Sequence, residues 1–342
     1  MATIQFTGGV NSSHRVQRWA KELWHTHQRD QFFYHMQGSG PNNIIMTKLD
    51  FDKAAGYQMT EGLIMPFTSE GIAGDAMLEE NEEAPDFHSM TWTIAQLRNA
   101  GRVAGQETQQ AVEYPLPEEI RMGLGDWMAE RRDERIFAEI GSSCSKIFYV
   151  NSRAGTSTVT ATDLLTLREI SKVHTYAKAT ANPKIPPLKI ANSNGKSAYR
   201  YAFVMHDHCS YDLKVNDSTY QQVTREAERR GGDNPLFIGM LIDWDGCILY
   251  DHDNCTLFSG WGSGSDVYGA ESYLLGRQAC IVGIGGYRIQ NKNGYLKWVE
   301  KKFDYENQIG IAVGIVIGEA KAVYNSKDFS VVSLRSARTN VS

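Results

Sequence analysis

Residues 51–140 constrain the fold most, because they predict a long two-stranded arm anchored by one long helix. A glycine-punctuated strand at Tyr57–Phe67 leads into an acidic loop at Ser69–Asp86, and a second extended run at Phe87–Val103 returns. A helix over about Pro117–Ile140 follows directly. An isolated two-stranded ribbon is only marginally stable in water. We therefore expect another chain to cover the arm, which points to a protein that assembles.

The composition is that of a globular protein. A chain of 342 residues holds two or three ordinary domains or one elaborated domain. It is 42% hydrophobic and 22% charged, which excludes a disordered chain. Its 35 Lys and Arg residues oppose 40 Asp and Glu residues, giving a net charge of -5 without a basic block. This weighs against a dedicated nucleic-acid-binding protein and leaves room only for weak, non-specific contact.

The cysteines and the apolar runs exclude several classes of protein. The five cysteines are odd in number and form no CxxC pair, so neither a disulfide framework nor a zinc ribbon is indicated. The N-terminus lacks the basic and apolar regions of a signal peptide. The longest apolar run, Ile309–Ile317, is too short to cross a bilayer. We expect a chain made and kept in a reducing cytoplasm, with no membrane partner.

A helix is predicted near the N-terminus, over about 14–31. Ser12 or Ser13 can cap it. Its apolar stripe has helical spacing and consists of Val16, Trp19, Ala20, Leu23 and Trp24. Two tryptophans on a terminal helix favour docking onto the body of the protein or onto a neighbour. A buried core helix of the chain's own fold remains the alternative.

The tip of the arm, residues 70–83, contains five Glu and one Asp. Its densest part contains Glu79, Glu80, Glu82 and Glu83. Charge runs of this kind are usually solvated. A carboxylate metal site is the alternative, although the spacing of a calcium-binding EF-hand is absent.

The long helix carries charge pairs at helical spacing. Arg131 with Glu134, and Arg135 with Glu139, lie three and four residues apart. Gly141 is predicted to end the helix. These arginines are also candidate partners for the acidic tip of a neighbouring chain.

Glycines predict three local features. Gly123 and Gly125 lower the helix propensity and indicate close packing of another backbone. Asp245-Gly246 between two apolar runs predicts a hairpin. The run 283–286 follows an apolar strand but lacks the third glycine of a dinucleotide-binding loop, so it predicts a bend in the strand.

Residues 146–287 alternate strand and helix, which indicates an α+β region. Helices are predicted over 163–179 and 219–230, the second with a capping box from Ser218 to Gln221. Strands are predicted at Ile44–Leu49, Tyr201–Met205, Leu241–Ile242, Cys247–Tyr250, Cys280–Ile284, Trp298–Phe303, Ile309–Val316, Ala320–Tyr324 and Val331–Leu334, with a turn at 325–328.

His206, His208 and Cys209 form the most suggestive chemical cluster. With 251–255 they supply enough ligand types for a metal ion, so a soluble metalloenzyme is one competing interpretation. The two clusters are more than forty residues apart in sequence, and no spacing forces them together. We interpret His206–Cys209 as a polar cluster at the end of a strand. No catalytic motif is present, and neither an enzyme nor a cofactor is expected.

The order of elements and several ordered segments resemble the major capsid proteins of tailed phages, which have the Hong Kong phage capsid fold. The local match is closer to the family typified by coliphage N-four. The segments that carry it are 18–23, 74–83, 96–100, 124–131, 234–237 and 317–329. They run in order over nearly the whole chain. Residues 181–200 and 251–275 match less well and are interpreted as local insertions.

The resemblance implies a four-part map. It makes residues 1–50 the N-terminal arm and 51–110 the extended loop. The peripheral domain comprises 111–160, with the spine helix, and 285–342. The axial domain, around the local symmetry axes, comprises 161–284.

The resemblance also implies function and partners. The chain is expected to form hexamers and pentamers of an icosahedral head that encloses double-stranded DNA, assembled in the host cytoplasm. A separate scaffolding protein, a portal protein and a decoration protein are the implied partners, and an encapsulin-like bacterial shell is the alternative. The predicted assembly contacts are Trp19, Leu23, Trp24, Glu79, Glu80, Glu82, Glu83, Trp92, Arg131, Arg132 and Arg135.

Overall fold

The computed structural model describes residues 31–49, 56–65, 67, 69–75, 77–111, 115–191, 197–228, 243–285 and 296–340. The predicted N-terminal helix lies outside them except for its last residue. The described residues belong to two compact units. The larger unit draws on Gln31–Leu97, Arg131–Tyr295 and Ile315–Ser342, and the smaller on Arg98–Glu130 and Leu296–Gly314.

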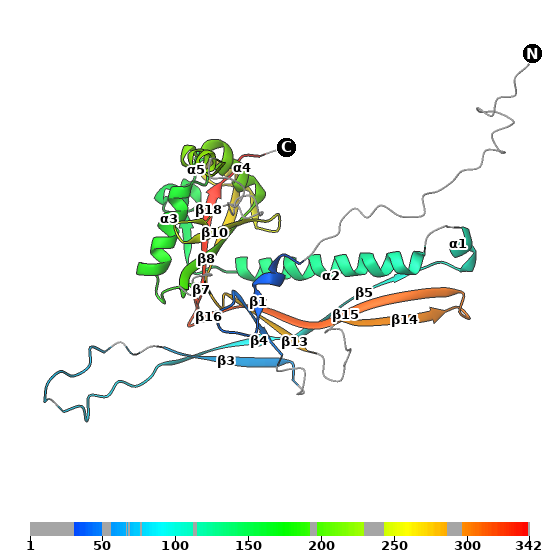
Figure 1. The fold of residues 1–342 in the computed structure, drawn as a ribbon, viewed down its shortest axis with the longest axis horizontal. Coiled ribbons are helices and arrows are strands. Elements are labelled where there is room, and N and C mark those ends of the chain that lie inside the picture. The colour runs from blue at the N-terminus through cyan, green and yellow to red at the C-terminus, as the bar shows by residue number, and fades with distance from the viewer. Residues whose placement is uncertain are drawn as a thin grey trace, which may run out of the picture. The chain divides into compact units, whose positions relative to one another are not determined.

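The larger unit contains an eight-stranded mixed sheet (Figure 1). Six strands follow the order β6-β18-β12-β8-β10-β9, while β11 pairs with β12 and β7 with β8. Their bounds are Ile147–Tyr149 (β6), Leu188–Ala191 (β7), Ser197–Met205 (β8), Asp243–Trp244 (β9), Cys247–Asp251 (β10), Leu257–Trp261 (β11), Val267–Leu275 (β12) and Val331–Ala337 (β18). β10 runs parallel to β8, and β6 runs parallel to β18. The sheet therefore joins segments that the sequence map divides between the axial and peripheral domains.

The strand β12 lies inside this sheet and corrects one prediction. Eight of its nine residues are buried, and it pairs with β8 on one side and with β18 on the other. The interpretation of 251–275 as an insertion is therefore wrong for 267–275. The strand was missed because Gly269, Glu271 and Ser272 interrupt its apolar pattern, and the cation that pairs with Glu271, Arg335, lies far away in sequence.

Three helices accompany the sheet. α3 (Leu167–Thr175) lies within the helix predicted over 163–179 and buries Leu167, Ile170 and Val173, and one turn of π-helix follows at Tyr176–Thr180. α5 spans Ser218–Glu228. Its cap is Asp217 and not Ser218, because the Asp217 carboxylate accepts the backbone N–H groups of Thr219 (2.8 Å) and Tyr220 (3.3 Å).

The helix α4 (Asp207–Asn216) was not predicted. It starts directly after β8, so His206 is its N-cap and His206–Cys209 do not form the end of a strand. Its Cys209 and Leu213 are fully buried in the core between α3 and the sheet. Polar residues in the first turn hid the helix, since their alternation with Cys209 resembles that of a strand.

A second sheet in the larger unit contains β1 (Gln37–Gly38), β2 (Ile45–Lys48) and β13 (Cys280–Gly285), with β13 pairing with the final part of β15 (Gln308–Lys321). β13 pairs without interruption, from Cys280 opposite Lys321 to Gly285 opposite Val316. The predicted bend at 283–286 is therefore wrong for its described residues. The predictions of strands at β2, β10, β13 and β18 are confirmed.

The two-stranded ribbon is shorter than predicted. β3 (Gln58–Ile64) and β4 (Phe87–Thr93) form an antiparallel pair, as expected. The chain leaves the ribbon at Ile94, and β5 (Ala95–Arg102) pairs with β15 instead. β3 begins at Gln58, so it offers no partner to the residues after Ile94. Elsewhere, Asp245 and Gly246 have positive φ in the β9–β10 hairpin, which confirms the predicted turn.

The smaller unit contains β14 (Lys297–Phe303), the first part of β15, the end of β5, the short helix α1 (Gln106–Ala111) and the start of α2 (Leu116–Gly141). β14 and β15 confirm the strands predicted at Trp298–Phe303 and Ile309–Val316, and they pair with each other in antiparallel fashion. Gly101 approaches Ile120 so closely that a Cβ there would lie 2.6 Å from that side chain. The Arg102 guanidinium lies 4.0 Å from the centre of the Phe303 ring.

The helix α2 confirms the predicted long helix within one residue at each end. The inference from Gly123 and Gly125 is wrong within the described chain, since a Cβ at either position would meet nothing within 4 Å. β16 (Val323–Tyr324) and β17 (Lys327–Asp328) form a hairpin that turns at Asn325 and Ser326, so the predicted turn at 325–328 is confirmed for its first two residues and its last two form a strand.

Candidate assembly surfaces

The ribbon has one covered and one open face. Met59, Met90 and Trp92 point inward and pack with Ile281 and Ala322. Thr60 and Thr91 face outward and hydrogen-bond to each other at 3.3 Å, and Ile64 lies opposite Phe87 on the same side. Ile64 and Phe87 are both exposed. The chain thus covers one face of the ribbon and leaves apolar side chains on the other.

Trp92 belongs to the covered face, so its prediction as an assembly contact is wrong. Its side chain is 3% exposed. It lies directly over Gly283 of β13, where an added Cβ would be 1.9 Å from the indole ring. The glycine therefore makes room for the tryptophan, which fixes the ribbon to the second sheet.

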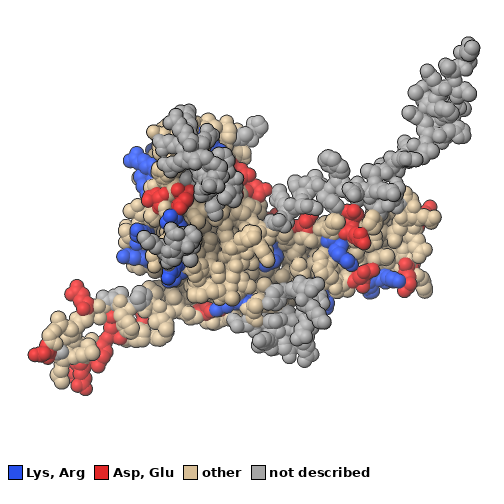
Figure 2. Space-filling model, viewed as in Figure 1, with Lys and Arg blue, Asp and Glu red and all other residues tan. Residues whose placement is uncertain are grey.

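The acidic loop (residues 69–86) joins the two strands of the ribbon. Glu79, Glu80 and Glu82 are exposed and Glu83 is half-buried. The Glu83 carboxylate accepts the backbone N–H of Ser69 at 2.9 Å and so links the two ends of the loop. Figure 2 shows red atoms over this loop with no blue among them. It presents a concentrated negative charge to its surroundings.

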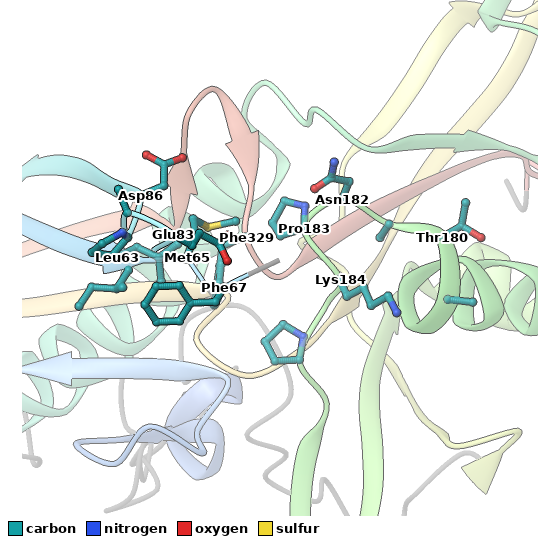
Figure 3. A pocket seen from close by; sticks show the side chains of 16 residues that line it. Leu63, Met65, Phe67, Glu83, Asp86, Thr180, Asn182, Pro183, Lys184 and Phe329 are labelled. Carbon is teal, nitrogen blue, oxygen red and sulfur yellow. The ribbon is translucent and has the colours of Figure 1, made fainter. Parts of the chain in front are cut away.

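A groove of about 700 Å³ lies at the base of the loop (Figure 3). Leu63, Met65 and Phe67 come to it from the ribbon side, and residues 179–186 and Phe329 come from the other side. Most of the lining is apolar. Together with the exposed Ile64 and Phe87, it extends the uncovered apolar surface of the ribbon.

The predicted arginines have partners within their own chain. Arg131 pairs with Glu134, as predicted. Arg135 pairs with Glu319 at 2.7 Å and not with Glu139, because Glu319 is buried on β15 and needs a compensating charge. Burial lowers the pKa of Arg132, and Glu319 opposes that shift. Arg135 is therefore committed to Glu319, whose charge also acts on Arg132, while Trp19, Leu23 and Trp24 lie outside the described residues.

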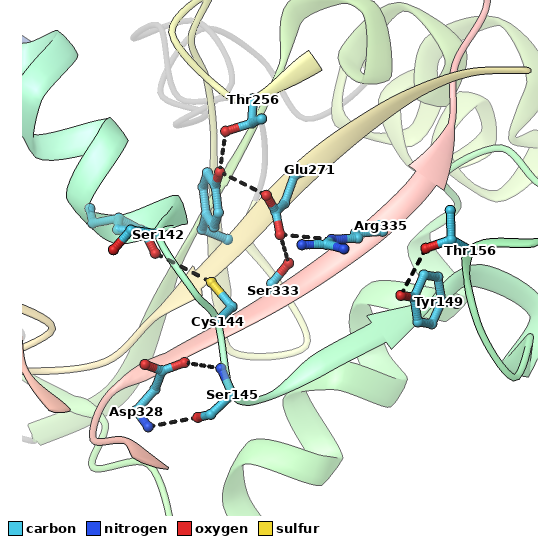
Figure 4. A network of polar contacts seen from close by, with 12 residues as sticks. Ser142, Cys144, Ser145, Tyr149, Thr156, Thr256, Glu271, Asp328, Ser333 and Arg335 are labelled. Carbon is cyan, nitrogen blue, oxygen red and sulfur yellow. Dashed lines mark hydrogen bonds and ion pairs between the residues drawn. The ribbon is translucent and has the colours of Figure 1, made fainter. Parts of the chain in front are cut away.

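The interior of the larger unit contains paired charges (Figure 4). Lys321 and Asp328 lie 2.9 Å apart with their side chains almost fully buried, and Asp328 also accepts the backbone N–H of Ser145 at 2.7 Å. Burial lowers the pKa of Lys146 to about 8, and its ammonium group donates to the Asp328 carbonyl at 2.7 Å. This network joins the end of α2 to β17.

A second part of that interior network centres on Glu271 of β12. Its carboxylate pairs with Arg335 of β18 at 3.0 Å and accepts from the Ser333 hydroxyl. Burial and the Glu271 charge together raise the pKa of Tyr273, whose hydroxyl bonds to Thr256 at 2.8 Å. These contacts hold neighbouring strands in register and leave no reactive group exposed.

The side chains of the histidine cluster are engaged in hydrogen bonding and ring stacking within the fold. The His206 ring accepts the backbone N–H of His208 at 3.1 Å, and the two rings stack 4.9 Å apart. Burial lowers the pKa of His206 to about 4, with the charges of His208 and Arg338 adding to the shift. Burial raises the pKa of Cys209 to about 12. Over the described residues, no three His, Cys, Asp or Glu side chains are grouped to hold a metal ion.

Across the part of the chain that the structure describes, no helix is both long and apolar enough to span a membrane.

Comparison with known proteins identifies the family. The model of the family described as phage capsid protein matches residues 7–145 and 141–339. The chain is 25% identical to the major capsid protein of Pseudomonas phage KPP25, over 92% of this chain and 93% of that protein.

Solved structures agree with this match. The capsid of Ralstonia phage GP4 has a TM-score of 0.82 at 22% identity, covering 96% of each chain. The capsid of cyanophage Pam1 has a TM-score of 0.80 at 18% identity, covering 98% of this chain and 99% of that one. These likenesses establish the predicted Hong Kong phage capsid fold, and the family match favours a phage head over an encapsulin-like shell. The chain therefore belongs to the phage capsid protein family and is a major capsid protein, a non-enzymatic subunit of the icosahedral head of a tailed phage.

Proposed function

We propose that this subunit forms hexamers and pentamers in which the ribbon of each copy lies across a neighbour. The observation that carries the proposal is the open face of the ribbon, where Ile64 and Phe87 are exposed beside the groove at its base. Apolar surface of this kind contributes ~25 cal/mol per Å2 when a partner covers it. Many modest contacts act together in a closed shell.

The same proposal includes the four-part map, in revised form. Residues 1–50 are the N-terminal arm and 51–110 the extended loop. The peripheral domain comprises 111–160 and 285–342 without β6 and β18, and the axial domain comprises 161–284 with those two strands. The pairing of β18 with β12, and of β6 with β18, supports moving both strands to the axial domain. The ordered segments between 18 and 329 support placing the chain in the family typified by coliphage N-four.

Further partners follow from the role of a head subunit. We infer a separate scaffolding protein, a portal protein at one vertex and a decoration protein on the outside. The net charge of -5 supports only weak, non-specific contact with the packaged double-stranded DNA.

The proposal is tested by expressing the full chain with its scaffolding protein and examining the product by negative-stain microscopy and sedimentation. Closed shells built of six- and five-membered rings are expected. A compact monomer under every co-expression condition, with the ribbon buried on its own subunit, would contradict it.

A further inference from the structure

Most of the charged side chains of the acidic loop have no oppositely charged partner among the described residues. Residues 69–86 include seven Asp and Glu residues and no Lys or Arg. Five of these carboxylates are exposed and form no ion pair within the described residues: Glu70, Asp75, Glu79, Glu80 and Glu82. Repulsion among these carboxylates raises the electrostatic free energy of the isolated loop, and a cationic surface beside the loop would lower it.

A complementary surface lies in the same unit, and Lys184 and Pro186 belong both to it and to the groove at the base of the loop. The stretch 170–206 contains six Lys and Arg residues and no Asp or Glu, in a chain that is acidic overall. Lys178, Lys184 and Lys189 are exposed there and make no ion pair among the described residues. Figure 2 shows blue atoms on the part of this unit near α3.

Two of these lysines line a groove. It has a volume of about 450 Å³ and is formed by His174, Lys178, Lys184, Ile185, Pro186, Pro187, Tyr199 and Tyr201. Lys189 lies on β7 directly opposite Tyr199 on β8, so it borders the same surface. Tyr199 is 61% exposed. We call this surface, with Lys189, the basic groove.

The loop also carries an apolar element that suits this groove. Met77 and Leu78 are 72% and 63% exposed, and they lie between Asp75 and Glu79. The walls of the basic groove are formed by two prolines, two tyrosines and an isoleucine, with lysines beside them. Apolar anchors surrounded by charged pairs are typical of specific protein interfaces.

We propose that the acidic loop of one subunit docks in the basic groove of a neighbouring copy. Met77 and Leu78 enter the groove, and the carboxylates on either side pair with Lys178, Lys184 and Lys189. Loop and groove are different surfaces, so the contact is heterologous and propagates around a ring until it closes. The inference rests on the proposed assembly into rings and names the contact within it.

Two other candidate partners, the arginines of α2 and nucleic acid, explain fewer of these features than a second copy does. Arg135 already pairs with Glu319, and the charge of the same buried carboxylate acts on Arg132, so both suit the loop less well than exposed lysines do. Nucleic-acid phosphates would pair with the lysines of the groove, yet they would leave the carboxylates of the loop and Met77 and Leu78 without a partner. A second copy satisfies both surfaces at once.

A charge exchange in the full chain, co-expressed with the scaffolding protein, tests the contact. One variant carries Glu79→Lys and Glu80→Lys, and the other carries Lys178→Glu and Lys184→Glu. Each alone is expected to lower the yield of sedimenting shells about tenfold, since each loses several exposed pairs and adds like-charge repulsion. The combination of all four is expected to restore the yield to within about twofold of the unaltered chain.

The matched control reverses two exposed cations of the same unit outside the groove, Arg168→Glu and Lys327→Glu, and leaves the yield unchanged. A second measurement places Glu82→Cys and Lys184→Cys on separate copies, and mixed shells are expected to form an intersubunit disulfide on oxidation.

Normal shells from both reversals, absence of rescue, or absence of the disulfide in intact shells would overturn the proposal. Normal empty shells with a loss confined to DNA-filled heads would reassign the lysines to nucleic acid. If the unaltered chain forms no shells at all, the assembly proposal itself fails, which is a different result.

Discussion

The acidic loop and the interior of the larger unit use the same residue types in opposite ways. Inside, Lys321, Asp328 and Glu271 are buried and Arg335 is partly buried, and each has an oppositely charged partner in its own chain. On the loop, carboxylates such as Glu79 are exposed and have no such partner among the described residues. Charge therefore specifies folding in the first region and is available for association in the second. Substitutions in the two regions should separate stability from assembly.

The largest effect is expected from Asp328→Ala. Removing this carboxylate leaves the Lys321 ammonium buried without its partner, which typically costs about 3–5 kcal/mol. Urea unfolding of the unassembled subunit should show the loss as a lower midpoint. The matched change Asp75→Ala on the loop should leave the midpoint unchanged. Equal midpoints for the two variants would remove the distinction between the regions.

Local patterns predicted those elements whose stability is local. The helix α2 and strands β2, β10, β13 and β18 follow from periodicity and turn residues. β12 was missed because the charge of Glu271 is compensated from far away, by Arg335, 64 residues later, and α4 was missed because its polar first turn alternates as a strand does. A short-range pattern cannot contain that information.

The assembly surfaces also divide into features that the local sequence predicts and features that depend on residues far away in sequence. The exposed carboxylates of the loop were predictable, since a charge run is visible in sequence. Trp92 was predicted as a contact and is instead a core residue. The prediction failed because Gly283, on which the indole ring packs, lies 191 residues further along the chain. The basic groove was not predicted, although the absence of Asp and Glu over 170–206 was a usable signal.

Gly283→Val tests how the ribbon is fixed to the core. A side chain there meets the Trp92 ring, and overpacking of this kind costs about 1–3 kcal/mol. Thermal unfolding followed by tryptophan fluorescence should show the destabilisation. Gly62→Val on β3 is the control, since a Cβ at Gly62 meets nothing within 4 Å. Equal stability of the two variants would mean that Trp92 does not anchor the ribbon.

Asp163 should make the larger unit sensitive to acid. Burial alone would raise its pKa, but hydrogen bonds from Arg153, Thr160 and Asn151 lower the pKa to about 2. The folded value lies below the unfolded one, so this stabilisation is complete above about pH 4 and is lost as the pH falls to about 2. The loss amounts to roughly 2 kcal/mol.

Urea unfolding of Asp163→Asn between pH 5 and pH 2 checks this assignment. The variant should be less stable at pH 5 and should lose less stability on acidification than the unaltered chain. Identical pH slopes for the two proteins would show that another carboxylate carries the acid sensitivity.

The double variant Glu82→Lys with Glu83→Lys is expected to have the smallest effect on folding. Its effect on assembly is expected to be clear. The loop contributes little to the core, so unfolding of the unassembled subunit should be unchanged, while the yield of shells should fall because the negative surface is reversed.

The isosteric control, Glu82→Gln with Glu83→Gln, retains an acceptor for the Ser69 N–H and loses only charge. If this control assembles as poorly as the lysine variant, the missing charge is the cause. If it assembles normally, repulsion by the new lysines is the cause. Normal shells from the lysine variant would show that these two carboxylates take no part in assembly.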